Sequence, residues 1–514
     1  MTADLFLAID QGTTSTRAIA YDRSWRVVAI AGRRLATNHP RAGWAEQDPD
    51  EILQSVIDAV VEVLDAVGGR GQIEAVGLAN QGETVVAWDR ATGSALGPAV
   101  LWSCKRSQGI VDRVAAAGVG PMIEELTGLP LDPYFSAGKM RWLMENVAAV
   151  GRAADDGRLA IGTVDAWLTA RLGGAARTDS STASRTQLFG LGSLGWDDTL
   201  LEWWDVRAEV LPVVVPSTGE LGTLGHPRWG GDLPLRAMLC DQQAALVAHG
   251  GHRPGTIKAT YGTGVFVLAN AGPAVPPPLP GILRTVAWTD ADGRPAYALD
   301  GGVFSAGSLL EWLHANLGIV DEPKRIDALA GEAPDSGGVQ LLPALAGLGA
   351  PWWRPEARVV ISGLSGATNR GHMARAAIDA IAQRVADIVE AMTPDLPTDV
   401  SAIPVDGGLT LSRLLMQRQA DLLGRPVAVA SEHESTALGV ALMAAIGVGR
   451  ISGVDTAAIA GVSNEVAPQI GPAEREAERA RWSAFVRGAL ALPGPSTRGT
   501  EATAVQTDPV AIQI

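Results

Sequence analysis

Residues 10–17 read DQGTTSTR and lie between two short runs of apolar and β-branched residues that are typical of strands. Gly12 permits a tight turn there, and its lack of a side chain lets the backbone approach a ligand. Hydroxyls and loop N–H groups at 13–16 can donate to phosphate oxygens, and Asp10 is placed to hold Mg²⁺ through water. An ordinary Ser/Thr-rich hairpin would look much the same. The pattern predicts a phosphate-binding turn, and the rest of the chain must decide between the two interpretations.

A second stretch of this kind, YGTG at residues 261–264, also lies between two predicted strands. Two such turns suggest two loops that hold one polyphosphate from opposite sides, because phosphoryl transfer depends on electrostatic positioning. The chain contains no GxxxxGK[ST] motif, no GxGxxG motif after a strand and no HRD/DFG set. The sequence therefore favours paired hairpins over a P-loop, a Rossmann fold or a protein kinase.

The two halves of the chain repeat one order of elements. Three short strands head each half, at 5–9, 17–22 and 25–32 and again at 256–260, 265–270 and 285–289. A helix-start signal at Asp48-Pro49 follows in the first half, and an amphipathic helix through 373–392 follows in the second. We therefore expect a duplicated α/β plan in two lobes with a central cleft.

These patterns also divide the chain. We expect an N-terminal domain at 1–253, a C-terminal domain at 254–465, and a C-terminal helix with a tail at 466–514. The helix begins after Pro472 and carries Trp482 and Phe485. Residues from Pro493 on are poor in large apolar side chains and are expected to pack weakly or to be disordered.

Composition limits the partners of the chain. Its 514 residues exceed the span of one usual hydrophobic core, and its formal charge is −15. That charge argues against nucleic acid and anionic membranes as partners, since both require a basic surface. We expect neither a transmembrane span nor a signal peptide. The two cysteines, Cys104 and Cys240, form no CxxC motif, which fits the reducing cytoplasm.

Together these segments resemble the FGGY family of carbohydrate kinases, in the superfamily of sugar kinases, heat-shock ATPases and actin, and within it the glycerol kinases most. The resemblance runs from Leu5 to about Gly449 and includes the segments 43–49, 80–84, 132–139, 178–186, 241–246 and 347–353. It implies a duplicated actin-like, ribonuclease H-like ATPase fold. It also implies MgATP as the donor and a small polyol, glycerol above all, as the acceptor. A homodimer or a homotetramer is left open.

The resemblance further implies a role for each matching residue. Asp241 would be the general base that takes the proton of the attacking hydroxyl, although an acid before Gln242 also suits a helix N-cap. Substrate hydroxyls would contact Glu83, Tyr134 and Gln242, and the apolar walls would be Trp102 and Phe266, two aromatics that could equally be core residues. The positions that match nucleotide contacts are Thr13, Thr14, Ser15, Arg17, Thr263, Gly307, Glu311, Gly408 and Ser412.

Four of these positions depart from the family pattern. Gly82 stands where glycerol kinases carry a substrate-binding Arg, and Cys240 stands where a Gly is usual. Losing the Arg would cost about 1.5–3 kcal/mol of substrate binding. On the adenine side Glu311 replaces Gln and Ser412 replaces Asn, and a carboxylate cannot donate as an amide does. An FGGY kinase for another polyol or a ketose is therefore the alternative, and a noncatalytic sensor is a remote one.

Two smaller expectations concern loops. Residues 228–232 align with the fructose-bisphosphate feedback loop of some glycerol kinases, and Asp232 reverses the charge of an Arg there. We expect no inhibition by that bisphosphate. We also expect His249 and His252 to be solvated surface side chains, because no metal-binding pattern surrounds them.

Overall fold

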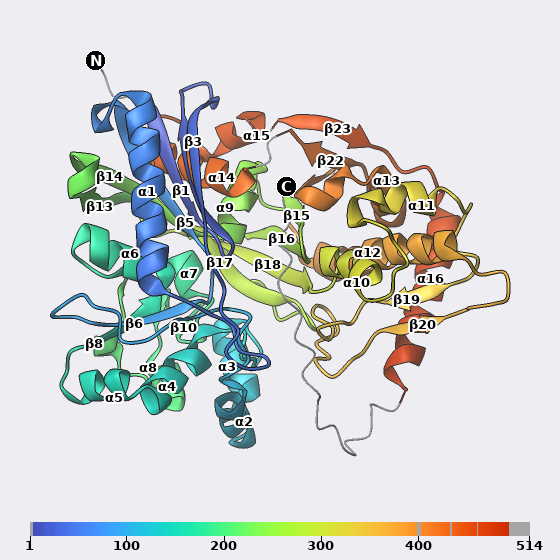
Figure 1. Cartoon of the computed structure of the whole chain (residues 1–514), viewed down its shortest axis with the longest axis horizontal. Coiled ribbons are helices and arrows are strands. Elements are labelled where there is room, and N and C mark those ends of the chain that lie inside the picture. Colours follow the sequence, from blue (N-terminus) through green and yellow to red (C-terminus); the bar gives the residue numbers. More distant parts are fainter. Residues whose placement is uncertain (1–3, 398–401, 432–433, 460, 493–514) are drawn as a thin grey trace.

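The computed structural model describes residues 4–397, 402–431, 434–459 and 461–492, and it divides into two α/β lobes (Figure 1). Each lobe is built on one large mixed sheet, and the strand order is β13-β14-β5-β1-β2-β3 in the N-terminal lobe and β17-β18-β16-β15-β21-β22-β23 in the C-terminal lobe. The predicted residues from Pro493 on lie outside the described residues. The predicted domain boundaries stay a prediction.

In the N-terminal sheet, three parallel strands end at one edge. The strands are β1 (Leu5–Gln11), β2 (Ser15–Tyr21), β3 (Val27–Arg34), β5 (Ile73–Asn80), β13 (Thr218–His226) and β14 (Gly231–Cys240). β1, β2 and β3 form the predicted antiparallel meander, and β1, β5 and β14 are parallel. Ala79 is paired with Asp10 on one side and with Leu239 on the other. The carboxyl ends of the three strands therefore lie side by side, where ligands of open α/β sheets are usually bound.

The C-terminal sheet repeats this plan. Its strands are β15 (Ile257–Tyr261), β16 (Val265–Gly272), β17 (Leu283–Thr289), β18 (Pro295–Val303), β21 (Ile403–Asp406), β22 (Val427–Ala430) and β23 (Val462–Val466). β15, β16 and β18 are antiparallel neighbours, while β15, β21 and β22 are parallel. Both sheets have an antiparallel edge strand, β13 or β23, beside the last parallel strand. The predicted duplication is confirmed.

Helices cover both faces of the N-terminal sheet. On one face lie α1 (Pro49–Val67) and α6 (Val164–Gly173), and on the other α9 (Asp241–Ala248) and α14 (Ser435–Gly447). α1 begins where predicted, since the carboxylate of Asp48 accepts the backbone N–H of Asp50 at its N-cap. Gly439 lets α14 approach α9 closely, because a Cβ there would lie 1.7 Å from the carbonyl oxygen of Ala244. The C-terminal part of the chain is thus packed directly onto the N-terminal lobe.

A smaller unit, most of which follows β5 in the chain, lies at the bottom of the N-terminal lobe in Figure 1. It contains the sheet β4-β7-β6-β8, from β4 (Glu46–Gln47), β6 (Val85–Asp89), β7 (Ala99–Val100) and β8 (Leu159–Thr163). Its helices are α2 (Gln108–Ala116), α3 (Gly120–Thr127), α4 (Ser136–Asn146), α5 (Ala148–Asp155) and α8 (Asp198–Trp204). Residues 102 and 134 belong to this unit, so it carries the predicted aromatic substrate contacts towards the strand ends.

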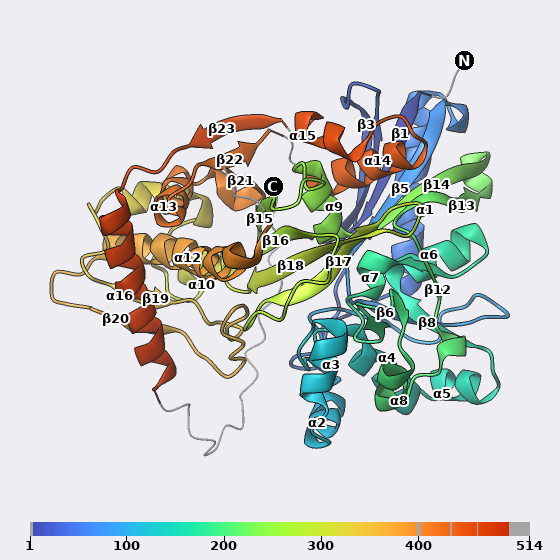
Figure 2. The ribbon, with the colours of Figure 1, turned by 180° about the vertical axis from the view of Figure 1, so that it is seen from behind.

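The remaining elements belong to the lobe connections and to the C-terminal lobe. They are α7 (Ser180–Ala183), β9 (Arg177–Asp179), β10 (Phe189–Gly190), β11 (Gly195–Trp196), β12 (Val213–Val215), α10 (Gly307–Ala315), α11 (Ile326–Ala330), β19 (Gln340–Leu342), β20 (Val360–Ser362), α12 (Arg370–Met392), α13 (Arg413–Leu423), α15 (Thr456–Ile459) and α16 (Pro472–Leu490). α12 and α16 are the two helices predicted from 373–392 and from Pro472. Seen from behind, α16 forms the outer edge of the C-terminal lobe (Figure 2). No helix within the described ranges combines the length and the apolar composition needed to cross a membrane.

Candidate active site

The site is organised around Asp10 and Asp241, which stand at the ends of two parallel strands, β1 and β14, that flank β5. Asp10 is the penultimate residue of β1, and Asp241 directly follows β14. Burial, together with the nearby charge of Asp241, raises the pKa of Asp10 to about 7. The structure therefore brings the predicted metal residue and the predicted base within electrostatic range of each other.

Asp241 is the first residue of α9, and Cys240 rather than Asp241 occupies the N-cap position. The backbone N–H of Gln242 donates to Oδ1 of Asp241 over 2.7 Å. Burial raises the pKa of Asp241, and the Gln242 hydrogen bond, Lys258 and Arg185 oppose that shift. A carboxylate with a raised pKa at a helix N-terminus suits a general base, which works best when its pKa approaches the working pH.

Glu83 lies on the turn after β5 and is held by an arginine that the sequence did not single out. Nε of Arg185 donates to Oε1 of Glu83 over 2.6 Å, and its Nη1 forms an ion pair of 2.9 Å with Oδ2 of Asp300 on β18. Glu83 has a φ of 58°, a left-handed conformation that costs free energy in a non-glycine residue. Burial raises the pKa of Glu83, against the opposing charge of Arg185. The strained, buried carboxylate thus has one fixed orientation.

Two aromatic side chains connect Glu83 to the first turn. The rings of Trp102 and Tyr134 meet edge to face with centroids 5.7 Å apart, and the indole Nε1 of Trp102 donates to Oγ1 of Thr13 over 2.9 Å. Burial, followed by the charge of Glu83, raises the pKa of Tyr134. Trp102 is only half-buried, so it is not the core residue that an aromatic side chain alone would suggest. The predicted substrate aromatics and the first turn form one connected wall.

Gln242 is oriented by Lys258, a second residue that sequence reasoning missed. Lys258 is fully buried on β15, and its Nζ donates to Oε1 of Gln242 over 2.7 Å and to Oγ1 of Thr260 over 2.9 Å. Because Lys258 binds the side-chain oxygen of Gln242, the amide NH₂ of Gln242 points away from Lys258 and can donate to another group. Phe266 is paired with Thr260 across β15 and β16, so it shares the sheet face of Lys258, and it is half-buried. The C-terminal lobe thus provides the side chain that holds Gln242 next to Asp241.

The first turn has the predicted hairpin geometry. The backbone N–H of Gly12 donates to the carbonyl of Ser15 over 3.0 Å, and Nε2 of Gln47 donates to the carbonyl of Thr13 over 2.6 Å. The side chain of Thr14 is exposed and that of Ser15 is half-buried. Arg17, paired with Asp10 across the hairpin, forms an ion pair of 3.0 Å with Glu434 just before α14. The turn is closed and is tied to both lobes.

The second turn packs against the start of α10. The carbonyl of Thr263 accepts the backbone N–H groups of residues 306 and 308 over 3.1 Å each, and a Cβ at Gly307 would lie 2.7 Å from the carbonyl oxygen of Gly262. Gly407 has a φ of 93°, and a Cβ there would lie 2.4 Å from the carbonyl oxygen of Tyr261. Thr263, Gly307 and Gly408 are therefore brought together at the ends of β15 and β21, with Thr263 and Gly408 exposed.

The two predicted adenine-side residues, Glu311 and Ser412, are less closely associated with each other than the turn residues are. Glu311 is exposed on α10, whereas Ser412 is the N-cap of α13 and its hydroxyl donates to Oδ1 of Asp327. In the part of the chain that the structure describes, no hydrogen bond or ion pair joins Glu311 to Ser412. Because Ser412 already caps α13 and binds Asp327, the geometry does not by itself connect either residue to an adenine base.

A divalent cation fits beside Asp10. After burial, the charge of Asp241 raises the pKa of Asp10, and the charge of Glu434 raises it further. Among the described residues, no group of three or more His, Cys, Asp or Glu side chains is arranged to hold a metal ion unaided. Mg²⁺ commonly binds one or two carboxylates and takes its other ligands from water and phosphate. The side chains therefore suit a cation that arrives with a polyphosphate.

The expectation for the two histidines is wrong. His249 is buried at the end of α9, and its Nε2 lies 2.9 Å from Oδ2 of Asp406. His252 is half-buried against the ring of Trp288, and burial lowers its pKa to about 4. Both side chains are covered because the C-terminal lobe packs onto α9, a long-range contact that the neighbouring sequence does not reveal.

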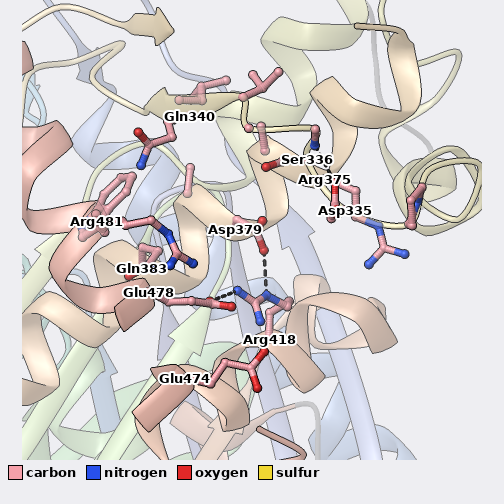
Figure 3. A pocket seen from close by; sticks show the side chains of 18 residues that line it. Asp335, Ser336, Gln340, Arg375, Asp379, Gln383, Arg418, Glu474, Glu478 and Arg481 are labelled. Atoms are coloured by element: carbon pink, nitrogen blue, oxygen red, sulfur yellow. Dashed lines mark hydrogen bonds and ion pairs between the residues drawn. The ribbon is translucent and has the colours of Figure 1, made fainter. Parts of the chain in front are cut away.

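A cavity of about 780 Å³ lies elsewhere, between the loop at 334–341 and the helices α12, α13 and α16. Arg418 dominates it in Figure 3, where its guanidinium points to Asp379 and Glu478. Nε of Arg418 lies 2.7 Å from Oδ1 of Asp379, and Glu478 pairs with Nη2. Arg418 thus neutralises Asp379 and Glu478, and no predicted site residue lines the cavity. It is separate from the candidate site.

Comparison with known proteins agrees with this geometry. Residues 5–248 match the N-terminal domain, and residues 257–448 the C-terminal domain, of the FGGY family of carbohydrate kinases. A glycerol kinase of Aromatoleum aromaticum is 42% identical over 487 residues, which cover 94% of this chain and 98% of that protein. A glycerol kinase of Citrifermentans bemidjiense is 40% identical over 493 residues, 95% of this chain and 99% of that protein.

Solved structures give the same answer. The Plasmodium falciparum glycerol kinase with ADP superimposes with a TM-score of 0.89 at 29% identity and covers 96% of this chain and 99% of its own. The xylulose kinase from Rhodospirillum rubrum, at 24% identity, has a TM-score of 0.84 and covers 95% and 99% of the two chains. The second likeness supports the fold alone. Together they confirm the predicted two-domain, actin-like ATPase fold.

Proposed function

Because the chain belongs to the FGGY family of carbohydrate kinases, we propose that it transfers the γ-phosphoryl group of ATP to glycerol. Relatives at about 40% identity over nearly the full length are glycerol kinases. The observation that carries the proposal is the meeting of three groups at neighbouring strand ends: Asp10 and the first turn, Glu83 with Tyr134, and Asp241 with Gln242.

In this proposal Asp241 accepts the proton of the attacking glycerol hydroxyl. The hydroxyl oxygen then bonds to the γ-phosphorus of ATP as the bond to the β–γ bridging oxygen breaks, and ADP leaves. The raised pKa of Asp241, set by burial, brings this carboxylate towards the range in which it can take up and release a proton. Glu83 accepts from the other hydroxyls, and Gln242 donates the amide N–H groups that Lys258 leaves free.

The nucleotide lies, in this proposal, between the two turns. Backbone N–H groups and hydroxyls of Thr13, Thr14 and Ser15 face the phosphates from the N-terminal lobe, with Arg17 beside them. Thr263 does so from the C-terminal lobe, and Gly307 and Gly408 let the nucleotide lie against bare backbone. Mg²⁺ would be held through water by Asp10 and would neutralise the phosphate charge.

Trp102 and Phe266 supply the apolar walls for the carbon chain of the polyol. Both are half-buried, and each has a neighbour in the site, Thr13 for Trp102 and Thr260 for Phe266. Partial exposure of large aromatics at the strand ends is expected of a binding wall rather than of a core. Trp102 also couples the polyol wall to the phosphate turn.

A kinase for another polyol or a ketose is the second candidate, favoured by Gly82 and Cys240 at the substrate end. Initial rates of ADP release should be compared for glycerol, erythritol, xylitol, dihydroxyacetone and ribulose. We expect glycerol to give the highest kcat/KM. If glycerol gives the lowest value of the panel, glycerol kinase activity is excluded and the second candidate takes its place. A chain that binds nucleotide but turns over none of the five would be a sensor.

We place the enzyme in the cytoplasm, since Cys104 and Cys240 are both free and buried, as is usual in a reducing compartment. Assembly as a homodimer or homotetramer stays a prediction, which light scattering of the purified protein tests directly.

A further inference from the structure

The roles proposed for the substrate-binding residues do not explain the close approach of Cys240 to Gly82. A Cβ built on Gly82 would lie 2.7 Å from Sγ of Cys240, a distance that real Cβ atoms do not tolerate. Among the described residues beyond its chain neighbours, no second heavy atom lies within 4 Å of that position. Gly82 also has no left-handed φ, so its backbone would accept an L side chain. The thiol of Cys240 therefore occupies the space that a side chain at position 82 would enter.

The thiol stands inside the candidate site. Cys240 is paired with Asn80 across β14 and β5, two residues before Gly82, and its Sγ lies 3.5 Å from Oδ1 of Asp241. Its backbone N–H donates a hydrogen bond of 2.9 Å to the hydroxyl oxygen of Ser181. Burial, then the charges of Asp241 and Glu83, raises the pKa of the thiol, so the sulfur is protonated and neutral. The position is rigid and uncharged.

We propose that Cys240 and Gly82 form one size-coupled wall that closes the polyol end of the site and limits the acceptor to three carbons. This inference rests on the proposed function and adds the residue pair that sets substrate length. In this proposal the sulfur atom beside the bare glycine takes the volume that a fourth hydroxymethyl group would need. Discrimination of about 10-fold or more is typical when one such group is admitted or rejected.

The test is a double-mutant cycle read on two substrates. Gly82→Ala adds only the colliding methyl group, Cys240→Ala removes only the sulfur, and the double variant exchanges one for the other. For each chain we would measure kcat/KM for glycerol and for erythritol, with melting temperature and ADP affinity as checks on folding. Cys104→Ala, which removes the other buried cysteine, combined with Gly82→Ala is the matched control.

Removing the sulfur should raise the erythritol-to-glycerol ratio of kcat/KM about 10-fold, because the site lengthens. Gly82→Ala alone should lower kcat/KM for glycerol about 30-fold, since the methyl group drives the thiol towards Asp241. The double variant should recover most of that loss and return the ratio towards its original value. The Cys104→Ala combination should show no recovery.

An unchanged ratio in Cys240→Ala, or losses that simply multiply in the double variant, would overturn the inference while leaving the kinase activity intact. If the unsubstituted chain phosphorylates no polyol, the proposed function itself fails, and this inference fails with it. Should Gly82→Ala not fold, the erythritol ratio of Cys240→Ala decides the matter alone.

Discussion

At the ends of β1, β5 and β14 the N-terminal lobe gathers charged side chains, Asp10, Glu83 and Asp241 among them. The corresponding ends of β15 and β21 in the C-terminal lobe carry the turns of Gly262 and Gly407 instead. The strand plan is the same, but the N-terminal strand ends carry three carboxylates, whereas the C-terminal strand ends carry two glycine turns beside the buried Lys258 and Asp406. In the proposed reaction the acceptor hydroxyl is deprotonated in the N-terminal lobe, and the phosphates are held by turns from both lobes.

This difference predicts opposite sensitivities, and the largest effect belongs to the N-terminal lobe. Asp241→Asn keeps the shape of the side chain but cannot accept a proton. We expect kcat to fall about 10³-fold, while the Kd for ADP stays within about threefold, because general-base catalysis contributes on that scale. Stopped assays with ATP and glycerol, together with calorimetry for ADP, measure the two quantities. A parallel loss of kcat and of ADP affinity would mean that Asp241 stabilises the fold rather than acting in the reaction.

In the C-terminal lobe, a single added methyl group should be enough to weaken nucleotide binding. Gly307→Ala places a Cβ 2.7 Å from the carbonyl oxygen of Gly262. We expect the Kd for ADP to rise about 10- to 100-fold, since overpacking costs about 1–3 kcal/mol. Glycerol affinity measured without nucleotide should not change. Gly488→Ala on α16, where a Cβ meets open space, is the control, and an equal effect there would refute the backbone argument.

Lys258 tests whether the two lobes cooperate across their boundary. Lys258→Met keeps the length of the side chain but removes the hydrogen bond to Oε1 of Gln242. We expect KM for glycerol to rise about 10-fold while the Kd for ADP is preserved, because a freed amide no longer faces the polyol reliably. Lys324→Met, at an exposed lysine, serves as the control. A loss confined to kcat would instead assign Lys258 to the reaction step.

These predictions depend on residues that the sequence revealed to different degrees. The hairpins at 10–17 and 261–264 could be predicted because a glycine between two strand-like runs is a local signal. The partners of Lys258, Arg185 and His249 could not, because they lie 16, 102 and 157 residues away in the sequence. No spacing rule reports which side chains that are far apart in the sequence meet in the folded chain. The Gly82–Cys240 contact is of the same kind, since each substitution was visible in the sequence and their contact was not.

The smallest expected effect concerns stability and pH. Burial raises the pKa of Asp165 to about 7, and its Oδ2 has no hydrogen-bond partner among the described residues. The folded state therefore binds more protons than the unfolded state between about pH 4 and pH 7, so stability falls as pH rises through that window. Asp165→Asn should remove this fall and raise the melting temperature by a few degrees at pH 7.5, with little change near pH 4.5.

Melting temperatures of both chains across this pH range provide the test. A constant difference between the wild-type chain and Asp165→Asn would show that the carboxyl is ionised throughout. In that case burial would not raise the pKa of Asp165 in the folded chain.

The crystal structure of this chain with glycerol and a nonhydrolysable ATP analogue tests the central claim most directly. The account predicts a glycerol hydroxyl within about 2.6–3.2 Å of a carboxylate oxygen of Asp241, with the γ-phosphate between the turns of Thr13 and Thr263. Glycerol bound away from Asp241, or phosphates that contact only one of the two turns, would contradict it.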